Sequence, residues 1–340
     1  MKRVGHLMEQ IASLDNLYLA FQKASRGKHD KKEILLFEQH FDTEIAQLHT
    51  ELLDGTIAIG QYRYFTIYDP KERIISAAPF RDRVLQHAII NVCMPYFDRT
   101  LIETTYATRK GKGVYAALDK AVTAASAYGY LAKLDVRKYY DSINHTILKA
   151  RLRRMFKDRA LLALFDKIID SYSTTTGCGL PIGNLTSQYF ANLYLSDLDH
   201  HAKEQWHASV YIRYMDDILI ASDDKQSLKA CVNNMVDYAK QTLLLTFKPP
   251  IIHKAKDGQV FLGYTIYPHY KLLAGRSKRR FRSKIITYSQ LLNEGVWTQA
   301  QYQEHILPLL SFVMHAACKT FRQECMILTK GNSRRVGLTA

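Results

Sequence analysis

The sequence has 340 residues, of which 47% are hydrophobic, and its 47 lysines and arginines against 32 acidic residues give a formal net charge of +15. Such a chain can bury a substantial core, and its charge favours a polyanionic partner such as nucleic acid, with a merely soluble basic protein as the alternative. The scattered cysteines form no C-x-x-C pair, so we expect no zinc ribbon. The N-terminus has no apolar signal core and no stretch approaches the length of a membrane span, so we expect a cytoplasmic protein without a membrane partner.

The first part of the chain predicts helices followed by a hairpin. Helical periodicity runs through roughly 7–24 and 32–53. The stretch QYRYFTIYDPKERIISAAPF then indicates two strands joined by a turn at Asp69-Pro70, and a long helix is expected over 82–97. The basic loop in TYATRKGKGVYAALDKA enters a helix near Val114 and could touch phosphate, although a plain turn is the alternative.

The stretch YLAKLDVRKYYDSINH predicts a strand over 130–136 and a helix that begins after Ser142 or Asn144. Asp135 therefore stands at the carboxyl end of a strand, where sites in α/β proteins are usually built. The alternative is that Asp135 caps the following helix, but it lies too close to the strand and too far from the helix for that role.

The stretch RYMDDILIA sets Asp216 and Asp217 between two runs of strand-forming residues and predicts a hairpin with these two acids at its turn. Asp-Asp is a poor turn by propensity, which favours a functional role for the two acids. The alternative is that they form an ordinary solvated hairpin tip. Adjacent carboxylates repel unless cations sit on them, and Mg²⁺ prefers oxygen ligands. If the strand that ends at Asp135 lies beside this hairpin, the three carboxylates converge and can hold two Mg²⁺ ions, with Mn²⁺ as an alternative ion, about 3.5–4 Å apart for in-line phosphoryl transfer.

Five motifs resemble those of the reverse transcriptases, in that family's order, from about Arg73 to Pro268. They are RIISAAPFRDRVLQHAI for the first fingers motif, LAKLDVRKYYDSI for the first catalytic strand, GLPIGNLTSQYFANLYL for the loop and helix under the base pair, YMDD for the catalytic hairpin and FLGYTIYP for the primer-grip region. The resemblance implies an α/β (α+β) right-hand polymerase fold with fingers, palm and a short helical thumb. It implies an RNA-directed DNA polymerase that binds template RNA, RNA/DNA hybrid and dNTPs.

The same resemblance divides the chain into domains. It implies an N-terminal helical extension over 1–60, fingers over 61–134 with further elements near 145–180, a palm with the catalytic hairpin over 135–270, and a helical thumb over 271–340. In the thumb, GRSKRRFRSKIITYSQLL spaces Phe281, Ile285, Tyr288 and Leu292 along one helical face. The basic residues lie largely away from that face, which is typical of a helix that follows a nucleic-acid backbone; a membrane-surface helix or a solvated face are the alternatives.

Individual roles also follow from the resemblance. Asp135 and Asp216 match the metal ligands, Asp217 supports the second metal, and Tyr140 matches the aromatic steric gate that excludes a ribose 2′-hydroxyl, with a core role for Tyr139 or Tyr140 as the alternative. The expected dNTP-binding residues are Arg73, Val136, Tyr140 and Ile182. The expected template- and primer-binding residues are Gly183, Ser187, Gln188, Lys278, Arg279 and Arg282. The family's lysine before the primer grip has no convincing match among Lys248, Lys254 and Lys256.

The stretch LPIGNLTSQ bears on the subtype. Most reverse transcriptases carry Gln-Gly at Ile182-Gly183 and Ser-Pro at Ser187-Gln188, and this chain departs at both places. The departure resembles the reverse transcriptases of diversity-generating retroelements, which copy a template-repeat RNA with errors at adenines and work with a small, basic, barrel-shaped accessory variability protein oligomer. Isoleucine cannot make the directional hydrogen bonds of glutamine, although Ile182 could simply be a packed loop residue. A retron or phage-defence reverse transcriptase is the alternative subtype, and a catalytically dead RNA-binding scaffold is the alternative class.

Overall fold

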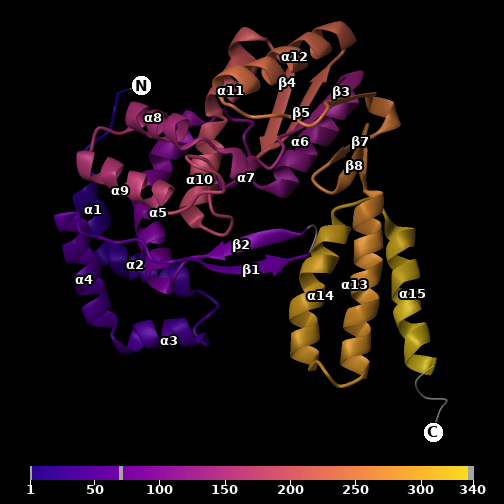
Figure 1. Cartoon of the computed structure of the whole chain (residues 1–340). Helices are drawn as coiled ribbons and strands as arrows, with labels where there is room; N and C mark the ends of the chain where they lie inside the picture. The colour runs from indigo at the N-terminus through magenta and orange to yellow at the C-terminus, as the bar shows by residue number, and fades with distance from the viewer. Residues whose placement is uncertain (1, 69–71, 336–340) are drawn as a thin grey trace. The chain divides into compact units, whose positions relative to one another are not determined.

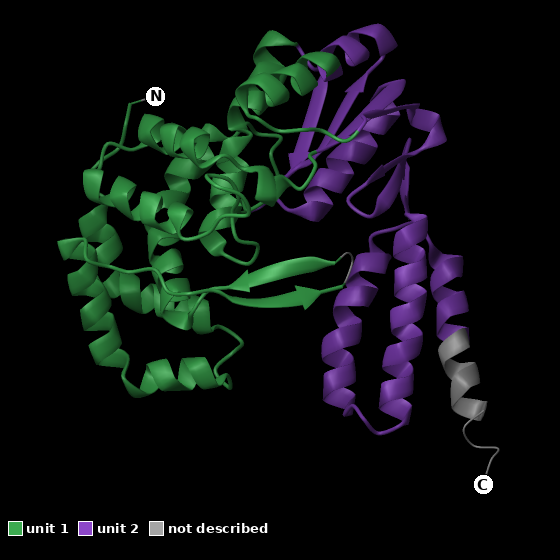
Figure 2. Cartoon of the chain, in the orientation of Figure 1, with its two compact units in different colours: residues 1–110, 136–206, 233–248 green, residues 111–135, 207–232, 249–340 purple. Residues whose placement is uncertain are grey.

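The computed structural model describes residues 2–68 and 72–335. Its helices and strands form two compact units that interleave along the chain (Figure 2), one built from residues 1–110, 136–206 and 233–248 and the other from 111–135, 207–232 and 249–340. The chain therefore passes repeatedly between the units. These units do not test the expected division into extension, fingers, palm and thumb, which stays a prediction.

The first unit begins with four helices (Figure 1): α1 (Met8–Ala12), α2 (Leu14–Ser25), α3 (Lys32–Gln39) and α4 (Phe41–Asp54). The expectation of two continuous helices was wrong, because each is broken once. Ser13 has extended backbone, with ψ 140°, and its Oγ accepts a hydrogen bond from the amide of Asn16, so it ends α1 and caps α2. His40, with φ −118° and ψ 25°, separates α3 from α4.

The predicted hairpin is present as β1 (Arg63–Ile67) and β2 (Arg73–Ala77), which pair antiparallel from Arg63 opposite Ala77 to Ile67 opposite Arg73. The turn expected at Asp69-Pro70 lies outside the described residues. The long helix that follows, α5 (Phe80–Thr100), begins two residues before the expected start at Asp82 and packs against α2 and α10.

The remaining helices of the first unit surround an aromatic core. They are α7 (Tyr139–Ser142), α8 (His145–Met155), α9 (Arg159–Asp170), α10 (Leu185–Tyr194), α11 (Ser196–His200) and a π-helical turn over His201–Gln205. Phe97, Phe156, Phe165 and Phe190 pack in tilted or edge-to-face pairs, with ring centroids 5.4–6.4 Å apart. Each buried aromatic ring contributes roughly 1.5–3 kcal/mol by leaving water, so this cluster fixes α5, α9 and α10 together.

The second unit contains a four-stranded antiparallel sheet in the order β4-β5-β3-β6. Its strands are β3 (Tyr130–Asp135), β4 (Val210–Tyr214), β5 (Asp217–Ser222) and β6 (Ile251–Lys254). The helix α6 (Val114–Ala127), expected near Val114, packs against β4. The helix α12 (Lys225–Thr242) follows β5 and spans the boundary between the units.

A second sheet and three helices complete this unit. The sheet has the order β7-β8-β9, with β7 (Gln259–Phe261), β8 (Tyr264–Tyr267) and β9 (Tyr270–Leu273), and a short 3₁₀ helix, Ala255–Asp257, precedes it. The helices are α13 (Gly275–Asn293), α14 (Gln299–Met314) and α15 (Lys319–Arg335). The hydroxyl of Tyr264 donates to the carbonyl oxygen of Phe312 at 2.5 Å, which ties β8 to α14.

The apolar face expected on α13 is present in part. Phe281 and Ile285 are buried, whereas Tyr288 and Leu292 are only half-buried. The ring of Tyr288 packs on Trp297, with centroids 5.0 Å apart, in the turn that leads into α14. None of the described helices combines the length and the apolar content needed to cross a membrane.

Asp158 joins the N-terminal segment to α9. Its Oδ2 accepts hydrogen bonds from the amides of Leu7 at 2.8 Å and Met8 at 3.1 Å, and its Oδ1 accepts one from Leu161 at 3.2 Å. Burial alone would raise the pKa of Asp158, but the amides of Leu7, Leu161 and Met8 outweigh it and hold the pKa below its usual value of 3.8.

We therefore expect Asp158→Ala to lower the free energy of unfolding by about 1–3 kcal/mol at pH 7, measured by urea denaturation. Because the folded pKa is depressed, this stabilisation is fully present above the unfolded pKa and is lost as the pH falls through the folded pKa. The difference from wild type should be constant between neutral pH and about pH 5. A difference below about 0.5 kcal/mol at pH 7 would contradict the role of this carboxylate.

Candidate active site

The pairing of β3 with β5 brings two of the expected catalytic carboxylates together. Asp135 is the last residue of β3 and Asp217 is the first residue of β5, and the register sets them directly opposite each other. Side chains opposite each other in an antiparallel pair have Cβ atoms about 4.5–5.5 Å apart. Asp216 immediately precedes Asp217, so the three acids lie at one end of the sheet.

The hairpin turn differs from the expectation by one residue. β4 ends at Tyr214 and β5 begins at Asp217, so the turn consists of Met215 and Asp216. Asp217 belongs to the strand because it pairs with Asp135, and Met215 must then adopt a left-handed backbone, with φ 54°. A positive φ is uncommon for a residue other than glycine, and such strained residues cluster at functional sites.

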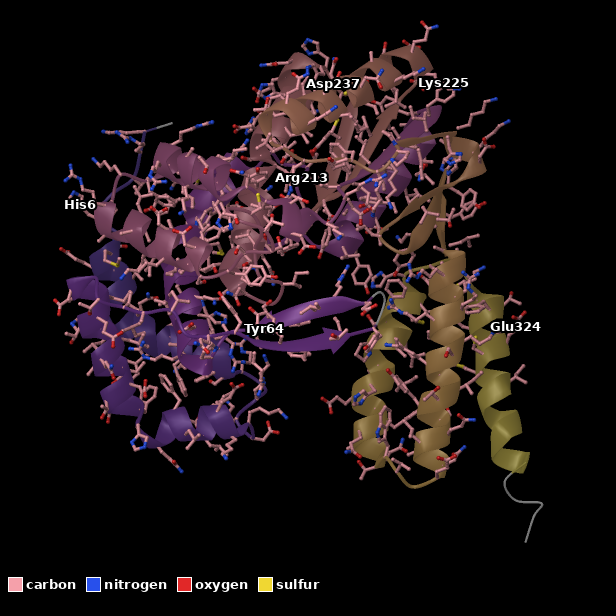
Figure 3. The ribbon with its side chains drawn as sticks, in the orientation of Figure 1. His6, Tyr64, Arg213, Lys225, Asp237 and Glu324 are labelled. Atoms are coloured by element: carbon pink, nitrogen blue, oxygen red, sulfur yellow. The ribbon has the colours of Figure 1, made fainter. Side chains whose placement is uncertain are left out.

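A buried arginine holds this turn. Arg213 on β4 is completely buried, and its Nη1 donates to the carbonyl oxygen of Met215 at 3.0 Å (Arg213 is labelled in Figure 3). A buried charge is retained only where hydrogen bonds satisfy it, so this arginine fixes the strained turn. Sequence reasoning missed Arg213, because a single arginine within an apolar strand does not reveal its partner.

Lys133 also belongs to the site and was missed. Its Nζ lies 3.2 Å from Oδ1 of Asp217, and alternation along β3 sets Lys133 on the same face as Asp135. Oδ1 of Asp217 is buried and makes no hydrogen bond, although the lysine is within ion-pair distance. This oxygen is therefore suited to a cation. Lys133 precedes Asp135 by two residues in a predicted strand, and this spacing could have indicated that the two side chains share a face.

The alternative that Asp135 caps a helix is excluded. The side chain that caps α8 is Asn144, whose Oδ1 accepts from the amide of Ile147 at 3.1 Å, and no side chain caps α7. Over residues 2–68 and 72–335, no three His, Cys, Asp or Glu side chains are grouped closely enough to hold a metal ion. The donor set at the hairpin consists of carboxylate oxygens, the ligand type that Mg²⁺ prefers, but the ligand assignment stays a prediction.

The loop that carries Ile182 and Gly183 is bound to β2 in the first unit. The amide of Ser76 donates to the carbonyl oxygen of Ile182 at 2.9 Å. Gly183 has φ +123°, and a Cβ there would lie 3.1 Å from the carbonyl oxygen of Ser76, so both its backbone and its surroundings require glycine. The side chain of Ile182 is half-exposed, so it is not a fully packed loop residue.

Tyr139 and Tyr140 have different environments. Tyr139 is buried and its hydroxyl donates to the carbonyl oxygen of Ala191, so Tyr139 is the core aromatic. Tyr140 is half-exposed, with its ring edge-to-face with Tyr139 at 5.9 Å. The amide of Leu180 donates to the carbonyl oxygen of Tyr140 at 2.8 Å. The loop before Ile182 is therefore bound to the backbone of the expected steric gate.

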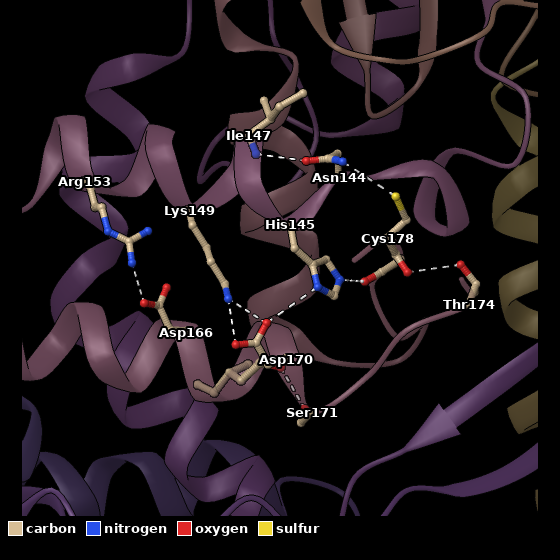
Figure 4. Close-up of polar contacts among 12 residues, drawn as sticks. Asn144, His145, Ile147, Lys149, Arg153, Asp166, Asp170, Ser171, Thr174 and Cys178 are labelled. Carbon is tan, nitrogen blue, oxygen red and sulfur yellow. Dashed lines mark hydrogen bonds and ion pairs between the residues drawn. The ribbon is translucent and has the colours of Figure 1, made fainter. Parts of the chain in front are cut away.

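A polar network binds the loop that leads to Ile182 (Figure 4). Nε2 of His145 donates to the carbonyl oxygen of Gly179 at 2.8 Å, and its Nδ1 lies 3.7 Å from Asp170. Lys149 binds the same carboxylate at 2.6 Å. The network links α8 and α9 to the loop, and sequence reasoning did not identify it, since its members are distant in the sequence.

The other expected nucleotide- and template-binding residues occupy varied positions in the first unit. Arg73 is exposed at the start of β2. Val136 is buried and forms a β-bridge with Phe247. In α10, Ser187 is buried, which leaves little of its side chain for a template, whereas Gln188 is half-exposed.

Among the three candidate lysines, the structure separates Lys248 from the others. Lys248 follows Phe247, which bridges to Val136, the residue after Asp135. Lys254 pairs opposite Tyr130 at the other end of β3, about 16 Å along the strand from Asp135 by strand geometry. Lys256 lies further along the chain, in the 3₁₀ helix. Strand geometry therefore argues against Lys254 and Lys256 acting on the carboxylates.

The expected thumb cations lie in one groove. Lys278, Arg279 and Arg282 line a hollow of about 830 Å³ between α13 and α15. Nζ of Lys278 and the guanidinium of Arg282 lie 5.8 and 5.6 Å from the ring centre of Phe321. The ring orients both cations by cation–π attraction, and Glu324, 3.7 Å from Arg282, neutralises them only in part.

Comparison with known proteins identifies the family. The family described as reverse transcriptase (RNA-dependent DNA polymerase) matches residues 69–266. Protein YkfC of Escherichia coli is 23% identical over 297 residues, which cover 72% of this chain and 77% of that protein. The putative COX1/OXI3 intron 1 protein of Saccharomyces cerevisiae is 23% identical over 163 residues, which cover 45% of this chain but only 20% of the yeast protein.

Similar solved structures include two telomerases. One is telomerase from Candida albicans in complex with a fragment of telomeric RNA, with a TM-score of 0.49 and 10% identity over 76% of this chain and 55% of that chain. The other is apo telomerase from Candida tropicalis, with a TM-score of 0.48 and 10% identity over 83% of this chain and 68% of that chain. Because the family match covers more than half of the sequence, the chain belongs to the reverse transcriptase family, with the mixed α/β right-hand polymerase fold and the enzyme class of RNA-directed DNA polymerases.

Proposed function

We propose that the chain copies a template RNA into cDNA and that Asp135, Asp216 and Asp217 are its catalytic carboxylates. The observation that carries the proposal is the register of β3 and β5, which sets Asp135 opposite Asp217 at a hairpin turn that contains Asp216. Like charges directly opposite each other destabilise a sheet, so this pair calls for a cation.

The three carboxylates would hold two Mg²⁺ ions, or Mn²⁺ in their place. When bound, such ions lower the pKa of the primer 3′-hydroxyl and neutralise the charge of the triphosphate. Lys133 keeps the carboxylate of Asp217 in position, since its Nζ lies 3.2 Å from Oδ1. Arg213 keeps the turn in its strained form through its bond to Met215.

We infer that the first unit supplies the residues that select the nucleotide. Arg73 would bind the triphosphate, Tyr140 would exclude the 2′-hydroxyl, and Ile182 with Gly183 would contact the nascent base pair. The loop and the gate are joined through Leu180, whose amide binds Tyr140, and the loop is joined to β2 through the Ser76–Ile182 bond. These backbone hydrogen bonds support a nucleotide pocket in which main-chain contacts hold Tyr140, Ile182 and β2 in position.

The net charge of +15 supports RNA and RNA/DNA hybrid as substrates, and Lys278, Arg279 and Arg282 would contact the backbone of the hybrid. For the subtype, we propose the error-prone enzyme of a diversity-generating retroelement, on the basis of Ile182 and of Ser187-Gln188. A retron or phage-defence enzyme is the alternative. Sequencing of cDNA made from a defined RNA would separate them, because only the first predicts errors concentrated at template adenines.

We also propose, from the same resemblance, that the enzyme works with a small, basic accessory variability protein oligomer. Two basic proteins repel each other unless a polyanion lies between them, and the chain itself carries a net charge of +15. Template RNA would therefore lie between the two proteins and contribute to their association. Purified components should associate more tightly with RNA present than after ribonuclease treatment.

We expect Asp216→Asn to abolish primer extension while the folded protein still binds RNA, and the same for Asp135→Asn and Asp217→Asn. The carboxylates act on metal ions, whereas RNA affinity comes from distributed positive charge. The matched control is Asp237→Asn, the same change at an exposed position of α12 (Figure 3), which should extend primers at the wild-type rate. Wild-type extension by Asp216→Asn would refute the assignment of the carboxylates.

We expect Tyr140→Ala to incorporate ribonucleotides, because removal of the ring opens the space beneath the sugar C2′. The measurement is the ratio of rNTP to dNTP incorporation on one primer–template. Tyr139→Phe is the control, since it keeps the buried ring and removes the hydroxyl that donates to the carbonyl oxygen of Ala191. Unchanged discrimination in Tyr140→Ala would show that another residue is the gate.

We expect Ile182→Gln to lower misincorporation at template adenines while synthesis continues. Glutamine can donate and accept hydrogen bonds, and one such bond is worth roughly 0.5–1.5 kcal/mol, or about a two- to tenfold change in selectivity. The backbone bond from Ser76 does not depend on the side chain, so the loop should keep its position. Ile182→Val, which remains apolar and β-branched, should keep the wild-type error rate. An adenine error rate equal to wild type in sequenced cDNA of Ile182→Gln would exclude Ile182 as a determinant of fidelity.

A further inference from the structure

The first unit contains a basic cavity that none of the roles above uses. It has a volume of about 700 Å³ and is lined by residues of α5, α8, α10, α11, the following π-helical turn and α12. The basic and aromatic residues that line it are Arg99, Arg151, Arg154, His200, His201 and Tyr238. We name it the arginine cavity. None of the proposed catalytic carboxylates, nucleotide-binding residues or thumb cations lines it.

Two arginines in the cavity share one carboxylate. Arg151 is buried, with Nη1 bonded to the carbonyl oxygen of Leu193 at 3.2 Å and to Oγ of Ser196 at 3.3 Å, and with Nη2 3.0 Å from Asp197. Arg154 reaches the same carboxylate at 3.1 Å, but its side chain is 68% exposed. Asp197 thus orders two guanidinium groups and neutralises only one charge.

A third arginine adds to the excess of positive charge. Arg99 is exposed and lies over the ring of Tyr96 at 5.4 Å, and no carboxylate of the described chain is within ion-pair distance of it. His200 is paired with Glu204 at 2.6 Å, so the acid nearest the histidines is already engaged. With His200 and Glu204 counted as a neutral pair and His201 as neutral, the three arginines and Asp197 leave two positive charges on the cavity wall.

Two rings, those of Tyr238 and His201, form another part of the wall. They lie 4.5 Å apart at an interplanar angle of 36°, and Trp206, which does not itself line the cavity, packs against both. These rings are half-exposed. Guanidinium groups beside aromatic faces suit a nucleotide, because the former bind phosphate through a planar fork of donors and the latter stack on a base.

We propose that the arginine cavity binds a phosphodiester group of RNA, and that it is an RNA-binding site additional to the nucleotide pocket and the thumb. The proposal takes from the proposed function only that RNA is the partner. A basic protein would be repelled by the excess of positive charge. An acidic peptide would satisfy the arginines but not use the aromatic wall, so RNA is the better fit.

The test compares Arg99→Ala/Arg154→Ala with Arg153→Ala in the full-length chain. Arg153 is the neighbour of Arg154 on α8, but it is bound to Asp166 at 2.5 Å and does not line the cavity. Loss of Arg154 leaves Asp197 paired with Arg151, so the double variant should fold. Thermal unfolding of all variants checks this point.

The readout is anisotropy of a short fluorescein-labelled single-stranded RNA, without dNTPs, over a series of salt concentrations. We expect the double variant to bind at least about threefold more weakly and the salt dependence of log K to fall by about 0.7 for each lost phosphate contact. Arg153→Ala should change affinity less than about twofold. Wild-type binding by the double variant, or an equal loss in Arg153→Ala, would overturn the proposal and favour an acidic partner or a general charge effect.

The same measurement in an Asp216→Asn background separates this inference from the proposed catalytic function. The background makes no DNA if the catalytic assignment is right, but it should lose RNA affinity on addition of Arg99→Ala/Arg154→Ala as the wild-type chain does. If Asp216→Asn still extends primers, the carboxylate assignment fails while the binding result stands. If the background binds RNA and the two arginine changes do not weaken it, the arginine cavity is not an RNA site.

Discussion

The end of the sheet that carries the proposed catalytic carboxylates depends on one interaction, the antiparallel pairing that sets Asp135 opposite Asp217. Six successive residue pairs, from Tyr130 opposite Ser222 to Asp135 opposite Asp217, hold β3 to β5. The pairs before the acids are largely buried and apolar, so hydrophobic contacts enforce a register that electrostatics alone would oppose. Lys133 offsets part of the repulsion from the same face. The acids are thus fixed before any cation binds, and binding requires little reorganisation of the chain.

In the first unit, a single loop connects the residues expected to select the nucleotide. Leu180 binds the backbone of Tyr140, Ile182 binds β2, and His145 binds Gly179. Because the contacts are made largely by main-chain atoms, the loop can carry different side chains at position 182 without losing its position. This explains how a substitution there could change fidelity and leave synthesis intact. The glycine at 183 lacks that freedom, since its backbone and its close approach to Ser76 both exclude a side chain.

Sequence reasoning identified the elements that local patterns determine. The strand that ends at Asp135 was predicted because apolar residues precede the acid, and the hairpin was predicted because two strand-forming runs flank Asp216. The turn was placed one residue too late because the pairing of Asp217 with Asp135 is a tertiary contact. The breaks at Ser13 and His40 interrupt helices whose periodicity continues across them. Arg213, Lys133 and His145 were missed, since a charged residue in a strand or helix gains its meaning only from its partner.

In the arginine cavity and in the groove between α13 and α15, neighbouring acids and rings order the positive charge. In the arginine cavity Asp197 orders two arginines and neutralises one, and in the thumb groove Glu324 and the ring of Phe321 orient Arg282 without removing the excess charge. An unpaired arginine is mobile and loses side-chain entropy on binding phosphate, whereas an ordered one loses less. Each acid therefore lowers the net charge by one, but it reduces the side-chain entropy that the neighbouring arginines lose when they bind phosphate. On the proposal that both surfaces bind RNA, ordered cations on each would allow moderate contacts to be exchanged one at a time while a polymerase moves along its template, which a single tight site would not permit.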